Sequence, residues 1–182
     1  MIKDAPVTLD NNQFYGIQLD DEQRVFRDAV WNKDIDIVFV NSRAGTGKTT
    51  VARIMANVFK TLGILSRGQL VEADRSKLVA GFSGQTAIKT NQLVDSAIGG
   101  VLFIDEAYTL ASSDNDSFGA EAIDTLLKRL EDDRGKFICI VAGYTRQMHD
   151  FIDSNPGMKS RFTQTINFED YTADELTQIC FN

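Results

Sequence analysis

The residues best suited to chemistry lie in a glycine-bearing loop that ends in Gly47-Lys48-Thr49. The apolar run 35–40 before this loop predicts a buried strand. Apolar residues spaced three and four apart after it predict a helix to about Leu62. A strand, a glycine loop and a helix are the context in which such a match indicates a phosphate-binding loop. We therefore expect a nucleotide phosphate site here.

Each residue type in this loop has a physical reason. Gly45 and Gly47 lack a Cβ atom, so the backbone can curl and present consecutive N–H groups to an anion. Lys48 can reach the β- and γ-phosphates, and the Thr49 hydroxyl can coordinate Mg²⁺. One position departs from the full pattern, because Ser42 stands where a first glycine is usual. The expected nucleotide contacts within the loop are Ala44, Gly45, Thr46, Gly47, Lys48, Thr49 and Thr50.

A second motif of chemical interest is an acidic pair further along the chain. Asp105 and Glu106 close the strand expected over 101–106, at the carboxyl edge where open parallel sheets bind ligands. Asp105 can hold Mg²⁺ through its water shell, and Glu106 can orient and polarise an attacking water. Alone, this pair could equally be solvated residues at the end of a strand. Together with the phosphate loop it indicates nucleotide hydrolysis.

The elements that must position these groups alternate along the chain. After a lead-in (1–18) and an N-terminal helix (19–34), we expect strands at 35–41, 68–74, 101–106, 137–142 and 163–168. Helices are expected at 50–62, 86–97, 118–130 and 147–152, and a short turn or helix at 76–82. This alternation predicts an α/β fold, a three-layer αβα sandwich of the P-loop NTPase type with a mainly parallel five-stranded sheet. We expect one domain over 1–182, with its core at 35–170 and a last helix starting at 171.

Composition argues against several classes of protein. The chain has 182 residues, 43% of them hydrophobic, and a formal net charge of −7, which argues against a general nucleic-acid binder. No apolar run reaches the length of a membrane span, and the N-terminus lacks a signal-peptide pattern. Cys139 and Cys180 suggest no disulfide scaffold, and His149 is the only histidine, so no zinc site is expected. We expect a cytoplasmic protein.

Several long sequence words occur in one order. They are GTGKTTVAR at 45–53, LVAGFSGQTAIKT at 78–90, GGVLFIDEAY at 99–108, FGAEAIDTLL at 118–127, VAGY at 141–144 and NPGMKSRF at 155–162. Over 46–176 the chain thereby resembles AAA+ ATPases of the CbbX/CfxQ type, a group with the red-type Rubisco activases and the sporulation protein SpoVK. The resemblance implies Mg²⁺-dependent ATP hydrolysis. It also implies homo-oligomers whose full-length forms remodel protein partners such as Rubisco.

The resemblance also implies roles for three side chains. Phe82 matches the aromatic of the central-pore loop that grips a threaded polypeptide. Its alternative is a loop aromatic packed onto the core. Arg161 matches the arginine finger, which acts in trans on the γ-phosphate of a neighbouring subunit. Its alternative is a surface arginine. Tyr144 stands where many relatives place a polar sensor, often Asn, so its role as a sensor stays open.

Residues 12–49 are more similar to the PhoH-type ATPases, through the words FYGI at 14–17, LDDEQ at 19–23 and NSRAGTGKT at 41–49. This resemblance implies that Gln23 can read the adenine edge, with Tyr15 and Gly16 as further nucleotide contacts. Gln23 could instead be a polar residue on the wet face of a helix. Two alternatives arise: a helicase-like ATPase acting on RNA, or a composite chain, natural or engineered, that binds nucleotide with little turnover.

The resemblance to AAA+ ATPases also implies a helical lid after the last predicted strand. In this family the lid normally closes over the nucleotide, and it would begin where this chain stops, near 171–182. From this we expect weak nucleotide affinity, slow turnover, and a monomer in place of a stable ring.

Overall fold

The computed structural model describes the chain in segments. The described residues are 13–14, 17–18, 37–42, 47–82, 84–111, 116–162 and 165–168. The expected N-terminal helix (19–34) and the expected start of a last helix (171–182) lie outside them.

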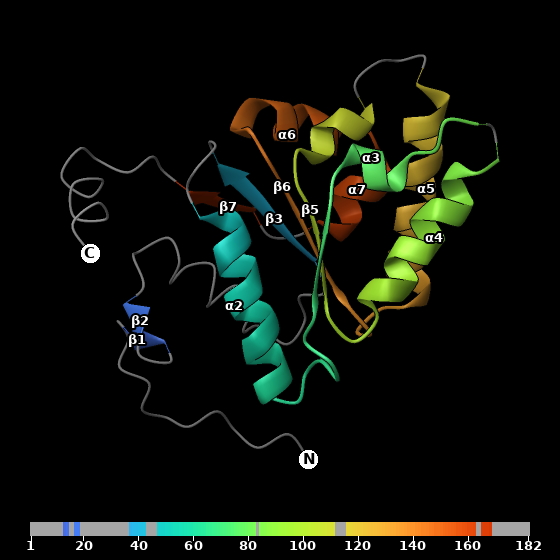
Figure 1. Cartoon of the computed structure of the whole chain (residues 1–182). Helices are drawn as coiled ribbons and strands as arrows, with labels where there is room; N and C mark the ends of the chain where they lie inside the picture. The colour runs from blue at the N-terminus through green and yellow to red at the C-terminus, as the bar shows by residue number, and fades with distance from the viewer. Residues whose placement is uncertain are drawn as a thin grey trace.

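A five-stranded sheet lies at the centre of the fold (Figure 1). Its strands, in spatial order, are β4 (Leu70–Ala73), β5 (Val101–Ile104), β6 (Ile138–Gly143), β3 (Ile37–Ser42) and β7 (Thr165–Phe168). Every neighbouring pair in this sheet is parallel. The predicted five-stranded, mainly parallel sheet is therefore confirmed, and all five predicted strands are present.

Seven helical segments connect and cover these strands within the described residues. They are α2 (Lys48–Thr61), α3 (Arg75–Leu78), α4 (Thr86–Ala97), the 3₁₀ helix η1 (Ala107–Ala111), α5 (Ser117–Asp132), α6 (Thr145–Asp153) and α7 (Pro156–Arg161). Each parallel strand pair needs such a crossover, because consecutive parallel strands cannot be joined by a tight turn.

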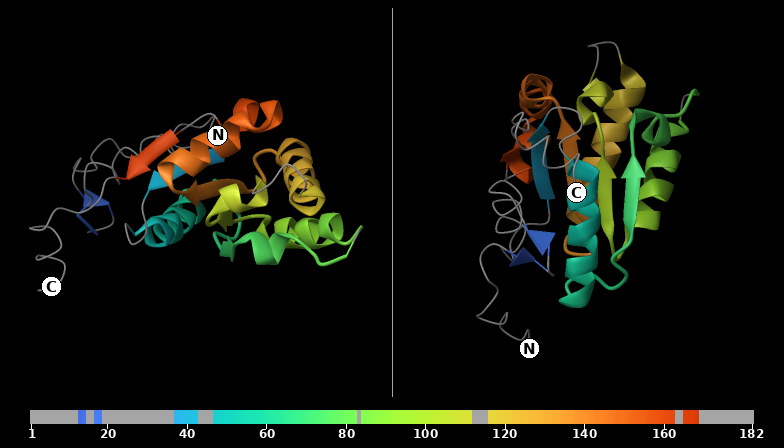
Figure 2. Two further views of the ribbon diagram at one scale, coloured as in Figure 1. Left: turned by 90° about the horizontal axis from the view of Figure 1, so that it is seen from above. Right: turned by 60° about the vertical axis from the view of Figure 1, so that its left-hand side comes forward.

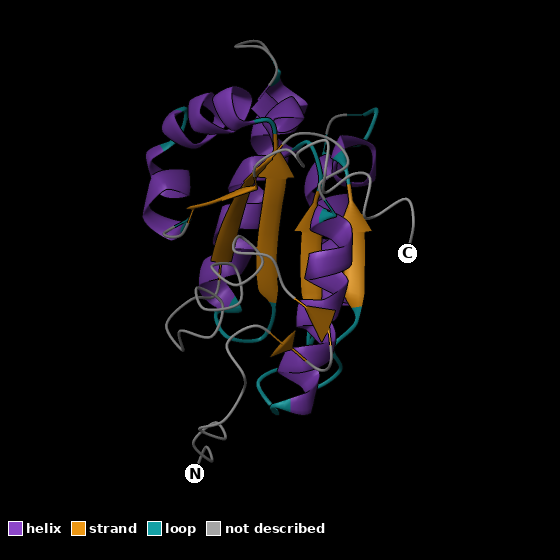
Figure 3. Cartoon of the chain, turned by 90° about the vertical axis from the view of Figure 1, so that its left-hand side faces the viewer, coloured by secondary structure: helices purple, strands orange, loops and turns teal. Residues whose placement is uncertain are grey.

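The two faces of the sheet are covered by different helices. Along β5, Val101 and Phe103 pack in one apolar cluster with α2, whereas Leu102 and Ile104 pack in another with α4, α5 and α6. This alternation follows from the two-residue period of a strand, and both faces are apolar because both are covered. Figure 2 and Figure 3 show α2 lying along one face of the sheet. The layered αβα arrangement is as predicted.

Four elements were not predicted from the sequence. A small antiparallel hairpin, β1 (Gln13–Phe14) with β2 (Ile17–Gln18), lies in the segment expected to be a lead-in. Strands of two residues are too short to show a period. Helices η1 and α7 were also missed, and their five and six residues are likewise too few for a clear helical repeat.

Several predicted boundaries were wrong by one or two residues, and the segment expected over 76–82 forms a helix that ends four residues earlier, at Leu78. The strand expected over 101–106 ends at Ile104, because Glu106 has a left-handed backbone with φ 49° that cannot continue a strand. The helix expected over 147–152 begins at Thr145 and ends at Asp153. None of the helices in the described segments is long and apolar enough to cross a membrane.

Candidate functional site

The start of α2 provides the positive end of the site. Gly47 precedes the helix with φ 79°, a left-handed conformation that glycine adopts without steric cost, so the chain can turn sharply from the loop into the helix. The N–H groups of the first helical turn have no carbonyl partner within the helix, and the helix dipole adds positive potential. The first turn of α2 contains no acidic residue that would cancel this field. It can therefore bind an anion such as a phosphate group.

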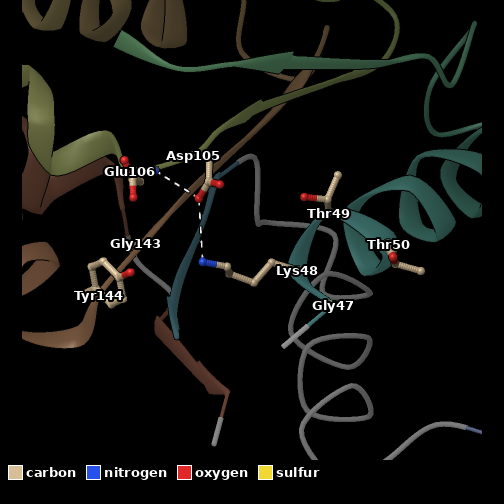
Figure 4. Close-up of a pocket in the computed structure, with 8 residues that line it drawn as sticks. All are labelled: Gly47, Lys48, Thr49, Thr50, Asp105, Glu106, Gly143 and Tyr144. Carbon is tan, nitrogen blue, oxygen red and sulfur yellow. Dashed lines mark hydrogen bonds and ion pairs between the residues drawn. The ribbon is translucent and has the colours of Figure 1, made fainter. Parts of the chain in front are cut away.

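The residues that follow β5 provide the acidic side. Asp105 lies directly after the strand, and its N–H donates to the carbonyl of Ala73 at 2.8 Å, which fixes it at the sheet edge. Its Oδ1 atom accepts a hydrogen bond from the Glu106 N–H at 3.0 Å. The same oxygen lies 3.7 Å from the Lys48 Nζ atom, which reaches it from the start of α2 (Figure 4). The predicted meeting of Lys48 with Asp105 is therefore present.

A cavity of about 390 Å³ opens between these two sides. The lining residues come from α2, from the segment after β5 and from the end of β6: Gly47, Lys48, Thr49, Thr50, Asp105, Glu106, Gly143 and Tyr144. The Lys48 side chain is only 12% exposed, whereas that of Asp105 is 46% exposed. The site thus combines a well-enclosed cation with carboxylates that solvent can reach.

Strand order explains why the end of β6 lies in the middle of the site. Because β6 lies between β3 and β5, its last residue, Gly143, pairs with Asn41 of β3. Tyr144 follows, and its ring lies 6.1 Å from that of Tyr108, with an angle of 42° between the planes. Tyr144 therefore lines the cavity where the sequence resemblance placed a sensor.

Glu106 is held in an uncommon backbone conformation. It is the single non-glycine residue with positive φ in the part of the chain that the structure describes. Such a conformation costs on the order of 1–2 kcal/mol for an L-amino acid. The carbonyl of Glu106 accepts hydrogen bonds from both the N–H and the hydroxyl of Thr109, at 2.9 and 2.7 Å. These bonds close the turn that exposes the Glu106 carboxylate at the cavity.

Tyr108 lies beside this turn. Burial raises the pKa of the Tyr108 hydroxyl above its ordinary value of 10.0, and the negative charge of Glu106 raises it further. The hydroxyl therefore stays protonated at neutral pH and can serve as a donor next to the Glu106 carboxylate.

The oxygen atoms of the cavity fit a magnesium ion. The Thr49 hydroxyl and the Asp105 carboxylate line the same cavity, and both are the hard oxygen ligands that Mg²⁺ prefers. No group of three or more acidic, histidine or cysteine side chains gathers as a metal cage within the described segments. Mg²⁺ commonly binds through one or two protein oxygens together with waters and substrate phosphates.

Two predicted functional residues lie away from this cavity. Arg161 is at the end of α7, where its guanidinium contacts the Gly157 carbonyl at 3.3 Å and the Glu131 carboxylate at 3.4 Å. It does not line the cavity of its own chain. Phe82 is 74% exposed, so the alternative of an aromatic packed onto the core is wrong.

The remaining predicted contacts lie outside the described residues. They are the loop residues Ala44, Gly45 and Thr46, and the proposed adenine-side residues Tyr15, Gly16 and Gln23. Their roles stay predictions.

Sequence reasoning assigned no role to Gly143 or Tyr108, although they belong to the words VAGY and GGVLFIDEAY. A Cβ atom on Gly143 would lie 2.7 Å from the Met148 Sδ atom and 2.8 Å from the Tyr108 Cδ1 atom. Glycine is thus needed for close packing at the rim of the cavity. No period or spacing in the sequence signals this requirement.

We expect Gly143→Ala to destabilise the domain by about 1–3 kcal/mol, because the added methyl overpacks a closed contact. The free energy of unfolding, measured from urea titration, checks this. Gly81→Ala is the matched stability control, since a Cβ atom there would meet no atom within 4 Å. Equal stability of the two variants would contradict the expectation.

Comparison with known proteins was made by sequence and by structure. The model of the family described as "ATPase family associated with various cellular activities (AAA)" matches residues 38–170. Stage V sporulation protein K of Bacillus subtilis is 50% identical over 135 residues, which cover 74% of this chain and 42% of the relative. The ESX-1 secretion system protein EccA1 of Mycolicibacterium smegmatis is 48% identical over 138 residues, which cover 74% of this chain and 24% of the relative.

A solved structure supports the same fold. The crystal structure of the FIGL-1 AAA domain in complex with ADP superposes with a TM-score of 0.58 at 19% identity, covering 81% of this chain and 47% of that chain. The present chain spans less than half the length of each of the three proteins. The predicted resemblance to AAA+ ATPases and to the sporulation protein is confirmed. This chain belongs to the AAA family of ATPases.

Proposed function

We propose that this domain binds Mg·ATP in the cavity between α2 and the end of β5 and hydrolyses its γ-phosphate. The observation that carries the proposal is the 3.7 Å approach of the Lys48 Nζ atom to the Asp105 Oδ1 atom, with Glu106 next in the chain. One ammonium group, one helix start and two carboxylates within one cavity are the parts that phosphoryl transfer requires.

The residues divide this work by position. Lys48 and the N–H groups that begin α2 hold the phosphates. Thr49 and Asp105 would hold Mg²⁺, which when bound neutralises charge on the phosphate oxygens. Glu106 orients a water molecule for attack on the γ-phosphorus and accepts its proton, while the bond to the β–γ bridging oxygen breaks. Tyr144 lies at the rim of the cavity, where it can contact the γ-phosphate or the water.

Lys48 exchanges partners in this scheme. In the structure its ammonium faces the Asp105 carboxylate at 3.7 Å, which is longer than a direct hydrogen bond. Phosphate oxygens offer it closer, charge-assisted bonds, so the pair can open at little cost when ATP enters.

We also propose that ATP hydrolysis here serves to remodel a protein partner, with Phe82 contacting the polypeptide. An aromatic side chain that is 74% exposed on a short loop after α3 is available for such a contact. Ile88, on the first turn of α4, is another exposed apolar residue close to it in the chain. Rubisco is one candidate partner, suggested by the resemblance to the CbbX/CfxQ type.

An assembled form would bring Arg161 to the nucleotide of a neighbouring subunit. Its contacts with Gly157 and Glu131 are 3.3 and 3.4 Å long, at the weak end of the hydrogen-bond range, so the guanidinium can be released at little cost. This supports action in trans, because the cavity of the same chain lacks Arg161.

A second candidate function is an ATPase acting on RNA, which the PhoH-like words of residues 12–49 favour. A composite chain with little turnover is the related alternative. Hydrolysis that increases on adding single-stranded RNA would favour the RNA-acting enzyme, whereas hydrolysis that is indifferent to RNA favours the protein-remodelling proposal. A cytoplasmic location belongs to either proposal.

The proposal is tested by titrating the domain with ATP in the presence and absence of Mg²⁺. We expect the melting temperature to rise with ATP and to rise further with Mg·ATP, because a ligand that binds only the folded state stabilises it in proportion to ln(1 + [L]/Kd). Release of phosphate should require Mg²⁺. A melting temperature that does not change at millimolar Mg·ATP would contradict the proposal.

A further inference from the structure

We infer that Thr109 and Arg75 are positioning residues for ATP hydrolysis, which together hold Glu106 in the conformation that points its carboxylate at the cavity. The inference rests on the proposed function and adds two residues to it. Neither side chain lines the cavity, so neither is a catalytic residue.

The first link runs from Glu106 to Thr109. Glu106 has φ 49°, and a residue in such a strained conformation persists only when its surroundings over-determine it. The N–H and the hydroxyl of Thr109 both donate to the Glu106 carbonyl, at 2.9 and 2.7 Å. With two donors on one carbonyl, the peptide that follows Glu106 is fixed in orientation. The direction of the Glu106 side chain depends on that peptide.

The second link runs from Thr109 to Arg75. The Arg75 Nη1 atom, on α3, donates to the carbonyl of Thr109 at 2.7 Å. Arg75 is itself held by the Asp116 carboxylate, with 2.6 Å between Nη1 and Oδ2. Arg75 therefore anchors the 3₁₀ turn η1, which contains Thr109, to the helix that follows β4.

The third link fixes Asp116. Its Oδ1 atom accepts the Gly119 N–H at 2.9 Å, so Asp116 also caps the start of α5. A Cβ atom on Gly119 would lie 2.0 Å from the Leu110 carbonyl oxygen, 2.5 Å from Asp116 Oδ2 and 3.0 Å from Arg75 Nη1. The pair of charges thus packs closely against the backbone at Gly119, where a larger residue would displace it.

The ion pair between Arg75 and Asp116 persists at neutral pH. The Arg75 guanidinium, 2.6 Å away, lowers the pKa of the Asp116 carboxyl, and the Gly119 N–H lowers it further, although burial opposes both effects. Asp116 therefore stays ionised well below neutral pH, and Arg75 keeps its partner throughout the range in which hydrolysis would be measured.

Three substitutions of threonine test the first link in the full chain. Thr109→Val removes the hydroxyl donor but keeps the shape, so we expect kcat for ATP to fall about tenfold, the worth of one hydrogen bond, while Kd for Mg·ATP changes less than about twofold. Thr109→Ser should restore kcat. Thr125→Val is the matched control, since its hydroxyl makes a 2.7 Å bond to the Glu121 carbonyl on α5, away from the site. A Thr109→Val enzyme with wild-type kcat would overturn the inference.

A double-mutant cycle tests the second link. Arg75→Met keeps an unbranched apolar stem but loses the guanidinium donors, and we expect a fall in kcat of about the same size as that of Thr109→Val. If Arg75 and the Thr109 hydroxyl hold the same turn, the double variant should be slowed by less than the product of the two single effects. Effects that multiply would show that the two groups act independently and would overturn the second link. Activities are compared well below each melting temperature, because Arg75→Met leaves Asp116 without its partner.

Hydrogen exchange gives a readout that does not depend on turnover. The Thr109 amide donates to the Glu106 carbonyl, so loss of the second donor or of the Arg75 anchor should speed exchange of this amide about tenfold. Thr125→Val should leave it unchanged. Unchanged exchange at Thr109 in both test variants would overturn the inference even if the wild-type domain hydrolyses no ATP, whereas faster exchange in a chain without hydrolysis would count against the proposed function alone.

Discussion

Replacing Glu106 by Gln should lower the rate of ATP hydrolysis by at least about a hundredfold while leaving Mg·ATP binding nearly unchanged. The amide keeps the size and the hydrogen-bonding capacity of the side chain, but it cannot accept a proton from water at neutral pH. Because Glu106 is exposed at the cavity and makes its backbone contacts through N–H and carbonyl groups, the substitution should leave the turn intact.

Single-turnover phosphate release, combined with a separate binding titration, checks this expectation. Glu72→Gln is the matched control, because Glu72 is a similarly accessible carboxylate on β4 that pairs with Arg53 at 2.6 Å and does not line the cavity. The control should hydrolyse ATP at the wild-type rate. Unchanged hydrolysis in Glu106→Gln would show that the catalytic base is a different group.

Replacing Lys48 by Met should abolish measurable stabilisation by Mg·ATP, with Kd rising at least about a hundredfold. Charge-assisted hydrogen bonds to phosphate are about twice as strong as neutral ones, and this ammonium is only 12% exposed, so its field is little screened by water. Its loss also removes the ammonium group that lies 3.7 Å from the Asp105 carboxylate, so that this carboxylate repels the phosphates more strongly.

The shift in melting temperature with Mg·ATP is the appropriate measurement for this variant. Folding of the protein without nucleotide should be little affected, because the Lys48–Asp105 contact is 3.7 Å long and its acidic partner is 46% exposed. Lys60→Met, at the exposed end of the same helix α2, is the matched control and should bind as the wild type does. An unaltered nucleotide response in Lys48→Met would place the phosphates elsewhere.

The sequence predicted the parts of the site that depend on the order of residue types. Lys48, Thr49, Asp105 and Glu106 were identified because glycine loops and strand-end carboxylates leave local patterns. The carboxyl ends of parallel strands lie at one edge of the sheet, so the approach of Lys48 to Asp105 could also be predicted. The cavity confirms that Lys48 and Asp105 come together and that Tyr144 lies beside them.

Other parts could not be predicted because they depend on three-dimensional packing. The need for glycine at position 143 arises from Met148 and Tyr108, which only the fold brings close. Thr109 and Arg75 are joined by a hydrogen bond across 34 residues of chain, and neither stands in a recognisable pattern. The left-handed conformation of Glu106 could likewise not be predicted, because an acidic pair at the end of a strand gives no sign of a positive φ. Helices η1 and α7 were too short to show a repeat.

The order of the strands has a consequence for how the chain folds. Strand β3 leads into the phosphate-binding loop, and its neighbours in the described sheet are β6 and β7, so that Ile37 pairs with Cys139 and Phe39 with Thr165. Strand β3 is synthesised well before both of its neighbours, so it cannot pair until β6 or β7 has also been synthesised. Such long-range pairing slows folding, and until it forms, the unpaired apolar strand β3 can associate with other chains. We expect the isolated N-terminal half to aggregate, and assistance by chaperones to raise the yield of active protein.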